Sequence, residues 1–353
     1  MRAIINGVGS YIPEVTVKNE DFLAHQFYSD YQQKIDEDPT SIIRKFQKIT
    51  GISERRYVSA DLTNEDIAFV SAQRALEKSS IDKESLDYVI VAHNYGTVVN
   101  GSNRSDFMPS IATRVKHRLG IRNNDCVAYD IIFGCPGWVE AMIQATIYIQ
   151  SGQAKHCLVI GSETLSRVVD HADRDSMIFA DGAGACVLSG ESTSEKGVLG
   201  FASQTFSFEE ADFLCNAQSF ADQENEQDRF IKMQGRKIYE FALNHVPSAM
   251  KRALEKSGIS LANLKKVLLH QANEKMDEAI IHRFYGLFNE QTPEGIMPMS
   301  IHLLGNSSVA TVPTLLDLIL QNKLEGHHIQ AGDCVMMASV GAGMNINALV
   351  YQF

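Results

Sequence analysis

The chain has 353 residues and a formal net charge of −11, with 44% hydrophobic and 21% charged residues. This composition is typical of a globular protein with two ordinary domains or one large duplicated domain. The acidic balance argues against nucleic acid as the main partner, and no apolar run approaches the roughly 20 residues that span a membrane. The first residues are typical of a strand and not of a signal peptide, so we expect a cytoplasmic protein.

The first third of the chain predicts alternating strands and helices. We expect a short strand and a turn through Pro13, then a polar insertion over 25–41 that could be helical. A turn and strand follow over 50–56, a capped helix over 63–78, and a mostly apolar, buried strand over 88–93.

The segment 127–138 predicts a buried strand, a tight turn and a helix. Apolar residues run to Phe133, Gly134 relaxes the backbone, and Pro136 suits a first helical turn. Cys135 therefore lies at a helix N-terminus, where a thiol should ionise more easily and attack carbonyl carbons. A small cysteine that only packs in the core is the alternative.

The six cysteines lack the spacing of a disulfide framework or a zinc site, so we expect no metal. They are residues 126, 135, 157, 186, 215 and 334.

An internal repeat relates the two parts of the chain. The segment 74–81 (RALEKSSI) recurs without a gap as 252–259 (RALEKSGI), and 132–135 (IFGC) matches 303–306 (LLGN). Two matches in one order indicate a duplicated βαβ-type unit. We therefore expect Cys135 and Asn306 at equivalent strand-to-helix turns, with His270 ending the duplicated strand. Sites in open α/β sheets form beyond the carboxyl ends of strands, so these three can converge.

The remaining segments complete the α/β pattern. We expect a strand over 157–162, a small-residue turn and buried strand over 179–188, and an acidic surface insertion over 206–229. A long helix over 233–257 and two closing strands within 334–350 follow. The GxGxxG spacing of a phosphate loop is absent, so the small residues are expected to serve packing.

The chain resembles the β-ketoacyl-acyl-carrier-protein synthase III group of thiolase-fold condensing enzymes. The similarity covers nearly the whole chain and rests on these motifs: GVGSYIP at 7–13, TGISERR at 50–56, FGC at 133–135, DGAGA at 181–185, HQAN at 270–273, GNSS at 305–308 and GAG at 341–343. The resemblance implies an internally duplicated, five-layered αβαβα thiolase-like fold. It implies an N-terminal half over 1–190 with the nucleophile and a C-terminal half over 191–353 with the histidine and asparagine.

The resemblance also implies a decarboxylative Claisen condensation. Cys135 would take an acyl group from a thioester, and the carbanion of a malonyl-type, carrier-bound thioester would then attack the acyl-cysteine. His270 and Asn306 would stabilise the enolate, and the amides of Cys135 and Ala342 would form an oxyanion hole. A buried histidine and a helix cap are the alternatives for His270 and Asn306. No cofactor is implied beyond the thioester substrates.

Departures from the family concern the substrate. Lys45 and Ile49 stand where many members carry a Trp and an Arg that sandwich the adenine of coenzyme A. Arg174 matches the other stacking arginine, and a surface ion-pair residue is the alternative for it. Substrate contacts are expected at Arg174, Asn273 and Met108, the last at the dimer side of the acyl pocket. The bulky segment around Cys135 predicts a reshaped acyl pocket. We therefore expect a fatty acid or polyketide-like pathway, such as dialkylresorcinol or aryl-polyene synthesis.

An acyl carrier protein is the expected partner of a homodimeric enzyme. Lys275 and Arg283 fall on one side of the helix after His270, and they predict a local basic docking face. A solvated helix face neutralised by Glu274, Asp277 and Glu278 is the alternative. Two alternatives remain: a thioester hydrolase or acyltransferase on the same scaffold, and a non-catalytic partner subunit.

Overall fold

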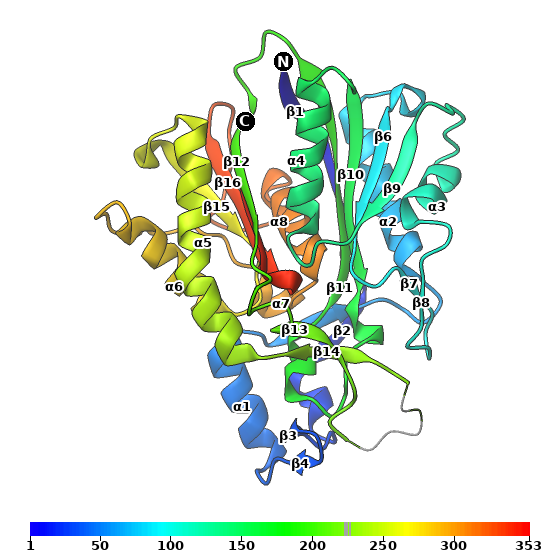
Figure 1. The fold of residues 1–353 in the computed structure, drawn as a ribbon, viewed down its shortest axis with the longest axis vertical. Coiled ribbons are helices and arrows are strands. Elements are labelled where there is room, and N and C mark those ends of the chain that lie inside the picture. Colours follow the sequence, from blue (N-terminus) through cyan, green and yellow to red (C-terminus); the bar gives the residue numbers. More distant parts are fainter. Residues whose placement is uncertain (222–224, 226) are drawn as a thin grey trace.

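Two β-sheets form the centre of the molecule, and the four strands of the second correspond in order to the first four of the five-stranded first sheet (Figure 1). The computed structural model describes residues 1–221, 225 and 227–353. The first sheet has the order β1-β11-β10-β6-β9. Its strands are β1 (Arg2–Tyr11), β6 (Tyr88–Ala92), β9 (Val127–Ile131), β10 (His156–Thr164) and β11 (Asp181–Glu191). The second sheet has the order β12-β17-β16-β15. Its strands are β12 (Gly197–Thr205), β15 (Leu264–Leu269), β16 (Cys334–Gly341) and β17 (Asn345–Gln352).

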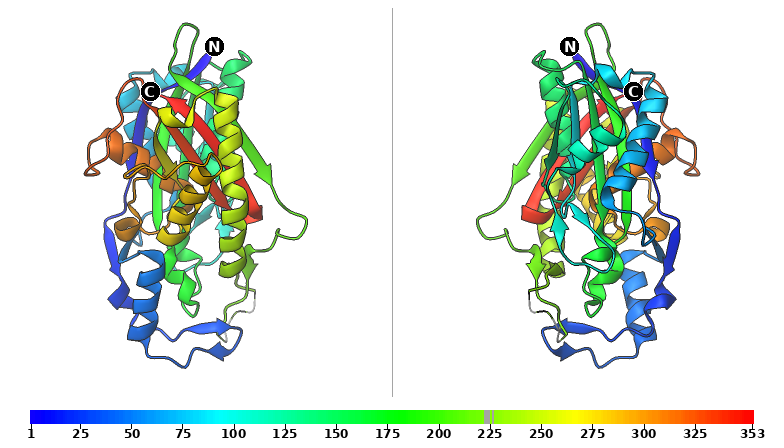
Figure 2. Two further views of the ribbon diagram at one scale, coloured as in Figure 1. Left: turned by 90° about the vertical axis from the view of Figure 1, so that its left-hand side faces the viewer. Right: turned by 90° about the vertical axis from the view of Figure 1, so that its right-hand side faces the viewer.

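Helices lie between the sheets and on both outer faces (Figures 1 and 2). The inner pair is α4 (Gly137–Gln150) and α8 (Thr311–Leu320). Outside the first sheet lie α2 (Asn64–Ser79) and α3 (Ile111–Arg118), and outside the second lie α5 (Gly235–Ser257) and α6 (Glu274–Gly286). The expected five-layered αβαβα arrangement is confirmed.

The inner layer explains why α4 is apolar almost all round. Trp138, Met142 and Ala145 of this helix are buried, because it packs on sheets on two sides. A helix without a polar face is stable only when both of its sides are covered. The side chains of the two sheets and α8 complete the same core cluster.

The smaller elements gather at one end of the sheets. They are β2 (Val15–Lys18), β3 (Tyr28–Asp30), β4 (Gln33–Lys34), α1 (Pro39–Thr50), β5 (Glu54–Tyr57), β7 (Thr97–Val98), β8 (Ser105–Asp106), β13 (Leu214–Ala217), β14 (Phe230–Met233) and α7 (Ile301–Leu304). Of the acidic segment 206–229, residues 222–224 and 226 lie outside the described residues. None of the helices in the described chain is long and apolar enough to cross a membrane.

The helical interpretation of 25–41 is wrong over most of its length. Strands β3 and β4 form a small antiparallel pair there, and α1 begins only at Pro39. Asp38 caps α1 by accepting a hydrogen bond from the Ser41 amide at 3.2 Å. A cap followed by proline fixes the start of the helix, so the preceding residues stay extended.

The strand before Cys135 is an edge strand and not the buried strand that we expected. β9 pairs only with β6, ends at Ile131 before Phe133, and leaves Val127 48% exposed. Its apolar residues predicted burial because sequence alone does not distinguish an inner strand from an edge that a second subunit could cover.

Small residues allow α2 to pack directly on β1. A Cβ on Gly9 would lie 2.5 Å from the Ala75 nitrogen and 2.6 Å from the Ser71 oxygen, both in the backbone of α2. Gly9→Ala should therefore lower the free energy of unfolding by about 1 to 3 kcal/mol, measured by urea denaturation. Gly286→Ala is the matched control, since a Cβ there meets nothing within 4 Å. Equal stability of the two variants would contradict this packing.

Candidate active site

Cys135 lies where the chain turns from β9 into α4. β9 ends at Ile131, Gly134 has a left-handed φ of 68°, and Pro136 is the N-cap residue of α4. The predicted order of strand, turn and helix is confirmed here. The free amides and the dipole of α4 are directed toward the thiol, a position that favours negative charge.

A second glycine turn, after β16, packs against this one. A Cβ on Gly341 would lie 2.5 Å from the Cys135 nitrogen, and a Cβ on Gly134 would lie 2.7 Å from the Ala342 nitrogen. The Asn345 side chain ties the turns together by donating to the Ala342 carbonyl at 2.8 Å and the Phe133 carbonyl at 3.3 Å. The two predicted oxyanion-hole amides therefore lie in adjoining turns.

Both turns open into a cavity of about 350 Å³. Cys135 and Ala342 line it together with six apolar side chains, Ile132, Phe133, Leu165, Phe179, Leu214 and Ile231. An apolar cavity that ends at a thiol suits an acyl chain.

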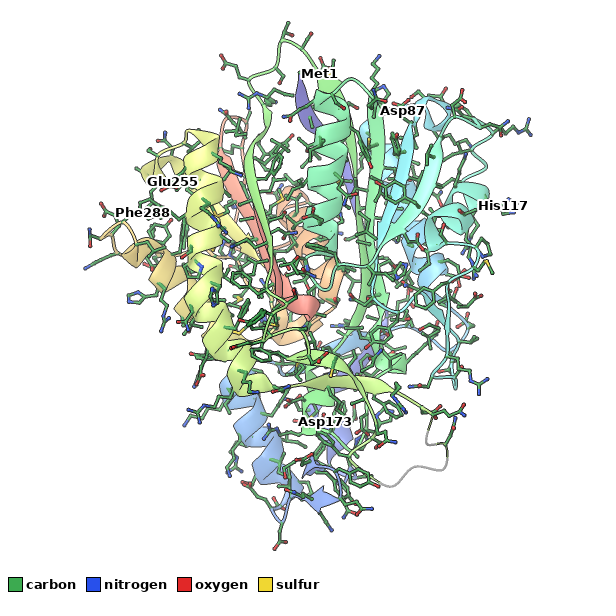
Figure 3. The ribbon with its side chains drawn as sticks, in the orientation of Figure 1. Met1, Asp87, His117, Asp173, Glu255 and Phe288 are labelled. Atoms are coloured by element: carbon green, nitrogen blue, oxygen red, sulfur yellow. The ribbon has the colours of Figure 1, made fainter. Side chains whose placement is uncertain are left out.

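Part of this cavity wall comes from the β13–β14 hairpin. A buried ion group anchors the hairpin, since Lys232 of β14 pairs with both Asp170 and Asp173; Asp173 is labelled in Figure 3. The Tyr95 hydroxyl also hydrogen-bonds Asn216 of β13. These contacts hold Leu214 and Ile231 against the cavity.

His270, Asn306 and Cys135 all interact with Ser308. The Ser308 hydroxyl donates to the Cys135 sulfur at 3.2 Å, and its amide donates to Asn306 Oδ1 at 2.8 Å. The Ser308 backbone also contacts the His270 imidazole, whose buried Nδ1 has no hydrogen-bond partner in the described part of the chain. The structure thus brings the three predicted residues to one place.

The predicted local structure of Asn306 is wrong. Asn306 follows the one-turn helix α7 and not a strand. It joins Phe179 in an isolated parallel bridge, where Ala180 donates to the Asn306 carbonyl at 2.8 Å. The match between 132–135 and 303–306 therefore reflects equivalent turns without equivalent preceding strands.

Burial dominates the electrostatics of the site. It raises the pKa of the Cys135 thiol to about 11, although the hydrogen bonds from Ser308 and from its own amide oppose this. Burial also lowers the pKa of His270 to about 4. Our expectation of an easily ionised thiol is wrong for this state, because desolvation disfavours the charged form. The resting site at pH 7 holds a neutral thiol and a neutral imidazole.

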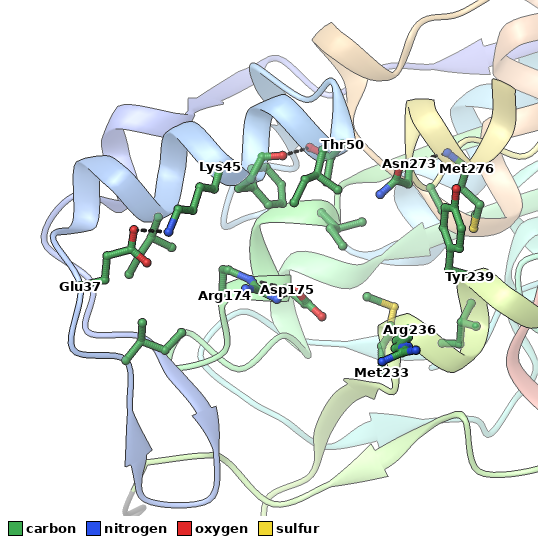
Figure 4. Close-up of a pocket in the computed structure, with 18 residues that line it drawn as sticks. Glu37, Lys45, Thr50, Arg174, Asp175, Met233, Arg236, Tyr239, Asn273 and Met276 are labelled. Atoms are coloured by element: carbon green, nitrogen blue, oxygen red, sulfur yellow. Dashed lines mark hydrogen bonds and ion pairs between the residues drawn. The ribbon is translucent and has the colours of Figure 1, made fainter. Parts of the chain in front are cut away.

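Arg174 and Asn273 line a second cavity of about 370 Å³ (Figure 4). Asn273 caps α6 by accepting a hydrogen bond from the Met276 amide at 3.1 Å, and Arg174 contacts Asp175 at 3.3 Å. Lys45 and Ile49 line the same cavity. Met108 lines neither cavity and is 86% exposed.

The two predicted docking residues differ in their surroundings. Lys275 is exposed on α6. Arg283 is exposed as well, but its guanidinium donates to the Leu243 carbonyl at 3.1 Å and to Asn244 Oδ1 at 2.9 Å. Arg283 therefore bridges α6 and α5 in addition to presenting its charge.

Sequence reasoning missed four polar residues of the site: Asn94, Glu163, Ser308 and Asn345. Ser308 stood in the GNSS motif without being singled out. The other three carried no signal, since their contacts depend on how distant segments meet.

Two family models match the chain. The model described as 3-oxoacyl-[acyl-carrier-protein] synthase III matches residues 129–206, and the model of the C-terminal part of the same family matches 254–353. These segments contain Cys135 and the pair His270 and Asn306. The chain belongs to the 3-oxoacyl-[acyl-carrier-protein] synthase III family.

Solved structures of this family are similar over the whole chain. The synthase III from Aquifex aeolicus VF5 is 27% identical with a TM-score of 0.80, covering 99% of this chain and 100% of its own. The Thermus thermophilus synthase III is 28% identical with a TM-score of 0.80, covering 99% and 98%. The priming β-ketosynthase of the R1128 polyketide pathway is 26% identical with a TM-score of 0.81, covering 100% and 96%.

The raised thiol pKa predicts how Cys135 reacts with iodoacetamide. The thiolate fraction rises about tenfold per pH unit below the pKa, so the alkylation rate should climb from pH 7 to 9 without a plateau. Intact-mass analysis measures the rate, and Cys135→Ser supplies the background from the other cysteines. A plateau below pH 8 would mean that the thiol is already ionised.

Proposed function

We propose that this chain catalyses the decarboxylative condensation of an acyl thioester with a carrier-bound malonyl-type thioester. The observation that carries the proposal is the meeting of the Gly134 and Gly341 turns, which sets the Cys135 thiol beside two backbone amides at the end of an apolar cavity. A thiol in that setting can form an acyl intermediate.

In the first half-reaction the Cys135 sulfur attacks the thioester carbonyl. The carbonyl oxygen gains negative charge and accepts hydrogen bonds from the amides of Cys135 and Ala342. The carbon–sulfur bond of the donor then breaks, and the pantetheine thiol leaves with the proton that Cys135 loses. The acyl chain extends into the apolar cavity.

In the second half-reaction the malonyl group loses carbon dioxide, and the electron pair of the broken bond forms an enolate. Asn306 can donate to the enolate oxygen through Nδ2, because its Oδ1 is held by the Ser308 amide. Neutral His270 can donate as well, since its pKa of about 4 leaves one ring N–H at physiological pH. The carbanion then attacks the acyl-cysteine, and the Cys135 thiolate leaves.

The second cavity supports carrier-bound donors over free coenzyme A esters. Its cations are each paired with a carboxylate: Lys45 with Glu37 at 2.6 Å and Arg174 with Asp175 at 3.3 Å, all four labelled in Figure 4, and Arg236 with Glu240 at 3.0 Å. A carrier's phosphopantetheine arm brings one phosphodiester, whereas coenzyme A adds a diphosphate and a 3′-phosphate. A cavity whose positive charges are already paired with carboxylates suits the less charged phosphopantetheine arm of a carrier.

We also propose a homodimer. The edge strand β9 and its surroundings expose apolar residues that a second copy would cover, among them Val127 at 48%, Ile132 at 63% and Ile147 at 46%. Met108 would then contribute to the partner's acyl cavity. The pathway, the cytoplasmic location and the lack of a cofactor stay predictions.

The partner-subunit alternative gains no support from the site, whereas a thioester hydrolase would use the same thiol and amides. A non-catalytic subunit has no need of the thiol, imidazole and carboxamide that surround Ser308 here.

The assignment of His270 and Asn306 to enolate stabilisation, and not to acylation of Cys135, can be tested with His270→Ala and Asn306→Ala. Each should slow malonyl decarboxylation by roughly 10² to 10³, because one enolate donor is lost, while acylation of Cys135 changes less. Acyl adducts are measured by intact mass, and carbon dioxide release measures the second step. Cys135→Ala should form no adduct. Equal losses in both steps would contradict the assigned roles.

Docking through α6 predicts a salt-dependent reaction with the carrier. Lys275→Glu should lower carrier-dependent kcat/KM and weaken its dependence on ionic strength, because steering by charge is screened by salt. Arg283→Glu should do the same with an added loss of stability, since its contacts with α5 are broken. Turnover of small thioester mimics is the control. An unchanged salt dependence would place the docking face elsewhere.

A further inference from the structure

A chain of buried hydrogen bonds leads from Cys135 to a carboxyl group outside the predicted triad. The Ser308 hydroxyl donates to the Cys135 sulfur at 3.2 Å, and Asn94 Nδ2 donates to the Ser308 oxygen at 3.0 Å. Asn94 also donates to Glu163 Oε2 twice, from Nδ2 at 2.8 Å and from its backbone amide at 2.7 Å. Four residues from four distant segments thus form one array.

The protons in this array have only one consistent arrangement. The Asn94 amide carries two protons, and they go to Ser308 and to Glu163. The Ser308 oxygen is therefore an acceptor toward Asn94, so its single proton is left for Cys135. Oε2 of Glu163 accepts both bonds from Asn94 whether the carboxyl group is ionised or carries its proton on Oε1, so the direction of every bond in the array is the same in both states.

The backbone of Ser308 is held in a strained conformation. Its φ is +54°, in the left-handed region that residues with a Cβ rarely adopt. Such strain persists only where surrounding contacts impose it, and it gathers at functional sites. The contacts here are three hydrogen bonds: the Ser308 amide donates to Asn306, the Ser308 hydroxyl donates to Cys135, and the same hydroxyl oxygen accepts from Asn94.

Glu163 lies on β10 with no exposed surface. Its Oε1 has no hydrogen-bond partner among the described residues, and burial raises its pKa to about 7. The titratable groups that face it are His93, Tyr95 and Cys135. A buried carboxyl with one unpaired oxygen is costly, so a structural role alone accounts poorly for it.

We propose that Glu163 and Asn94 are positioning residues that lock the Ser308 hydroxyl onto the sulfur of Cys135, where it stabilises the thiolate. The inference rests on the proposed role of Cys135 as the acyl acceptor. A hydrogen bond to a charged sulfur is stronger than one to a neutral thiol, so it helps most as the proton leaves. While the sulfur is acylated the hydroxyl has no charge to stabilise, so the array acts on acylation and again when the thiolate leaves at the end of condensation, but not on malonyl decarboxylation.

The pH profile of Cys135 alkylation by iodoacetamide tests the first link. Ser308→Ala should lower the alkylation rate roughly tenfold to a hundredfold at fixed pH and move the profile to higher pH, whereas Ser308→Thr keeps the hydroxyl and should restore most of the rate. Ser71→Ala is the matched control, because that buried hydroxyl donates to the Ala68 carbonyl at 2.9 Å, away from the site. A Ser308→Ala profile that matches the parent enzyme would overturn the proposal.

A double-mutant comparison tests the other two residues. Asn94→Ala and Glu163→Ala should each raise the thiol pKa more when Ser308 is present than in the Ser308→Ala background, because they act through the hydroxyl. A coupling below about 0.3 pH units would overturn their positioning role. Asn94→Ala keeps the test valid if Glu163→Ala fails to fold.

The half-reactions separate this inference from the proposed function. In Ser308→Ala, acylation should fall while malonyl decarboxylation by enzyme that is already acylated stays near the parent rate. Parent enzyme that forms no condensation product would refute the proposed function. If the parent enzyme condenses normally but Ser308→Ala loses acylation and malonyl decarboxylation equally, only the positioning role is refuted.

Discussion

The close approach of two glycine turns is the constraint on which the site depends. Gly134 and Gly341 stand where any Cβ would collide with the backbone of the opposite turn. Strand β9 of the first sheet leads into one turn, and β16 of the second sheet ends at the other. The two sheets, with α4 and α8 between them, therefore have to hold their relative position closely enough for the amides of Cys135 and Ala342 to serve one oxygen atom.

Burial gives the site its chemical character. The same desolvation that excludes water raises the pKa of the thiol and lowers that of the imidazole, so neither group is charged before the substrate arrives. Charge that develops during the reaction then meets fixed donors instead of solvent, and such preorganised donors act strongly in a dry site. Ser308 links the two halves of this arrangement, since it contacts the nucleophile and also the residues assigned to the enolate.

In the proposed function the two cavities hold different parts of the substrate. The apolar cavity beside Cys135 is closed on one side by the β13–β14 hairpin, whose anchoring through Lys232 sets the position of Leu214 and Ile231. The cavity at Arg174 carries paired charges and is bordered by α1, which follows the small β3–β4 pair. We therefore expect substitutions in these two segments to change which acyl group and which carrier fit.

Local patterns in the sequence determined the strand, turn and helix around Cys135, the capping of α2 by Thr63 and Asp66, and the duplicated helix and strand that relate the two sheets. These features depend on neighbouring residues or on a repeated pattern, so they can be read along the chain. The division of the chain near residue 190 and the roles of the site residues stay predictions. Only the tertiary structure decided that β9 is an edge strand, that Asn306 follows a helical turn, and that the thiol is neutral at rest. The tertiary structure alone also showed that Asn94, Glu163 and Ser308 are linked to Cys135 by hydrogen bonds. These bonds join segments up to 214 residues apart, and the segments are desolvated together, so no local sequence pattern predicts them.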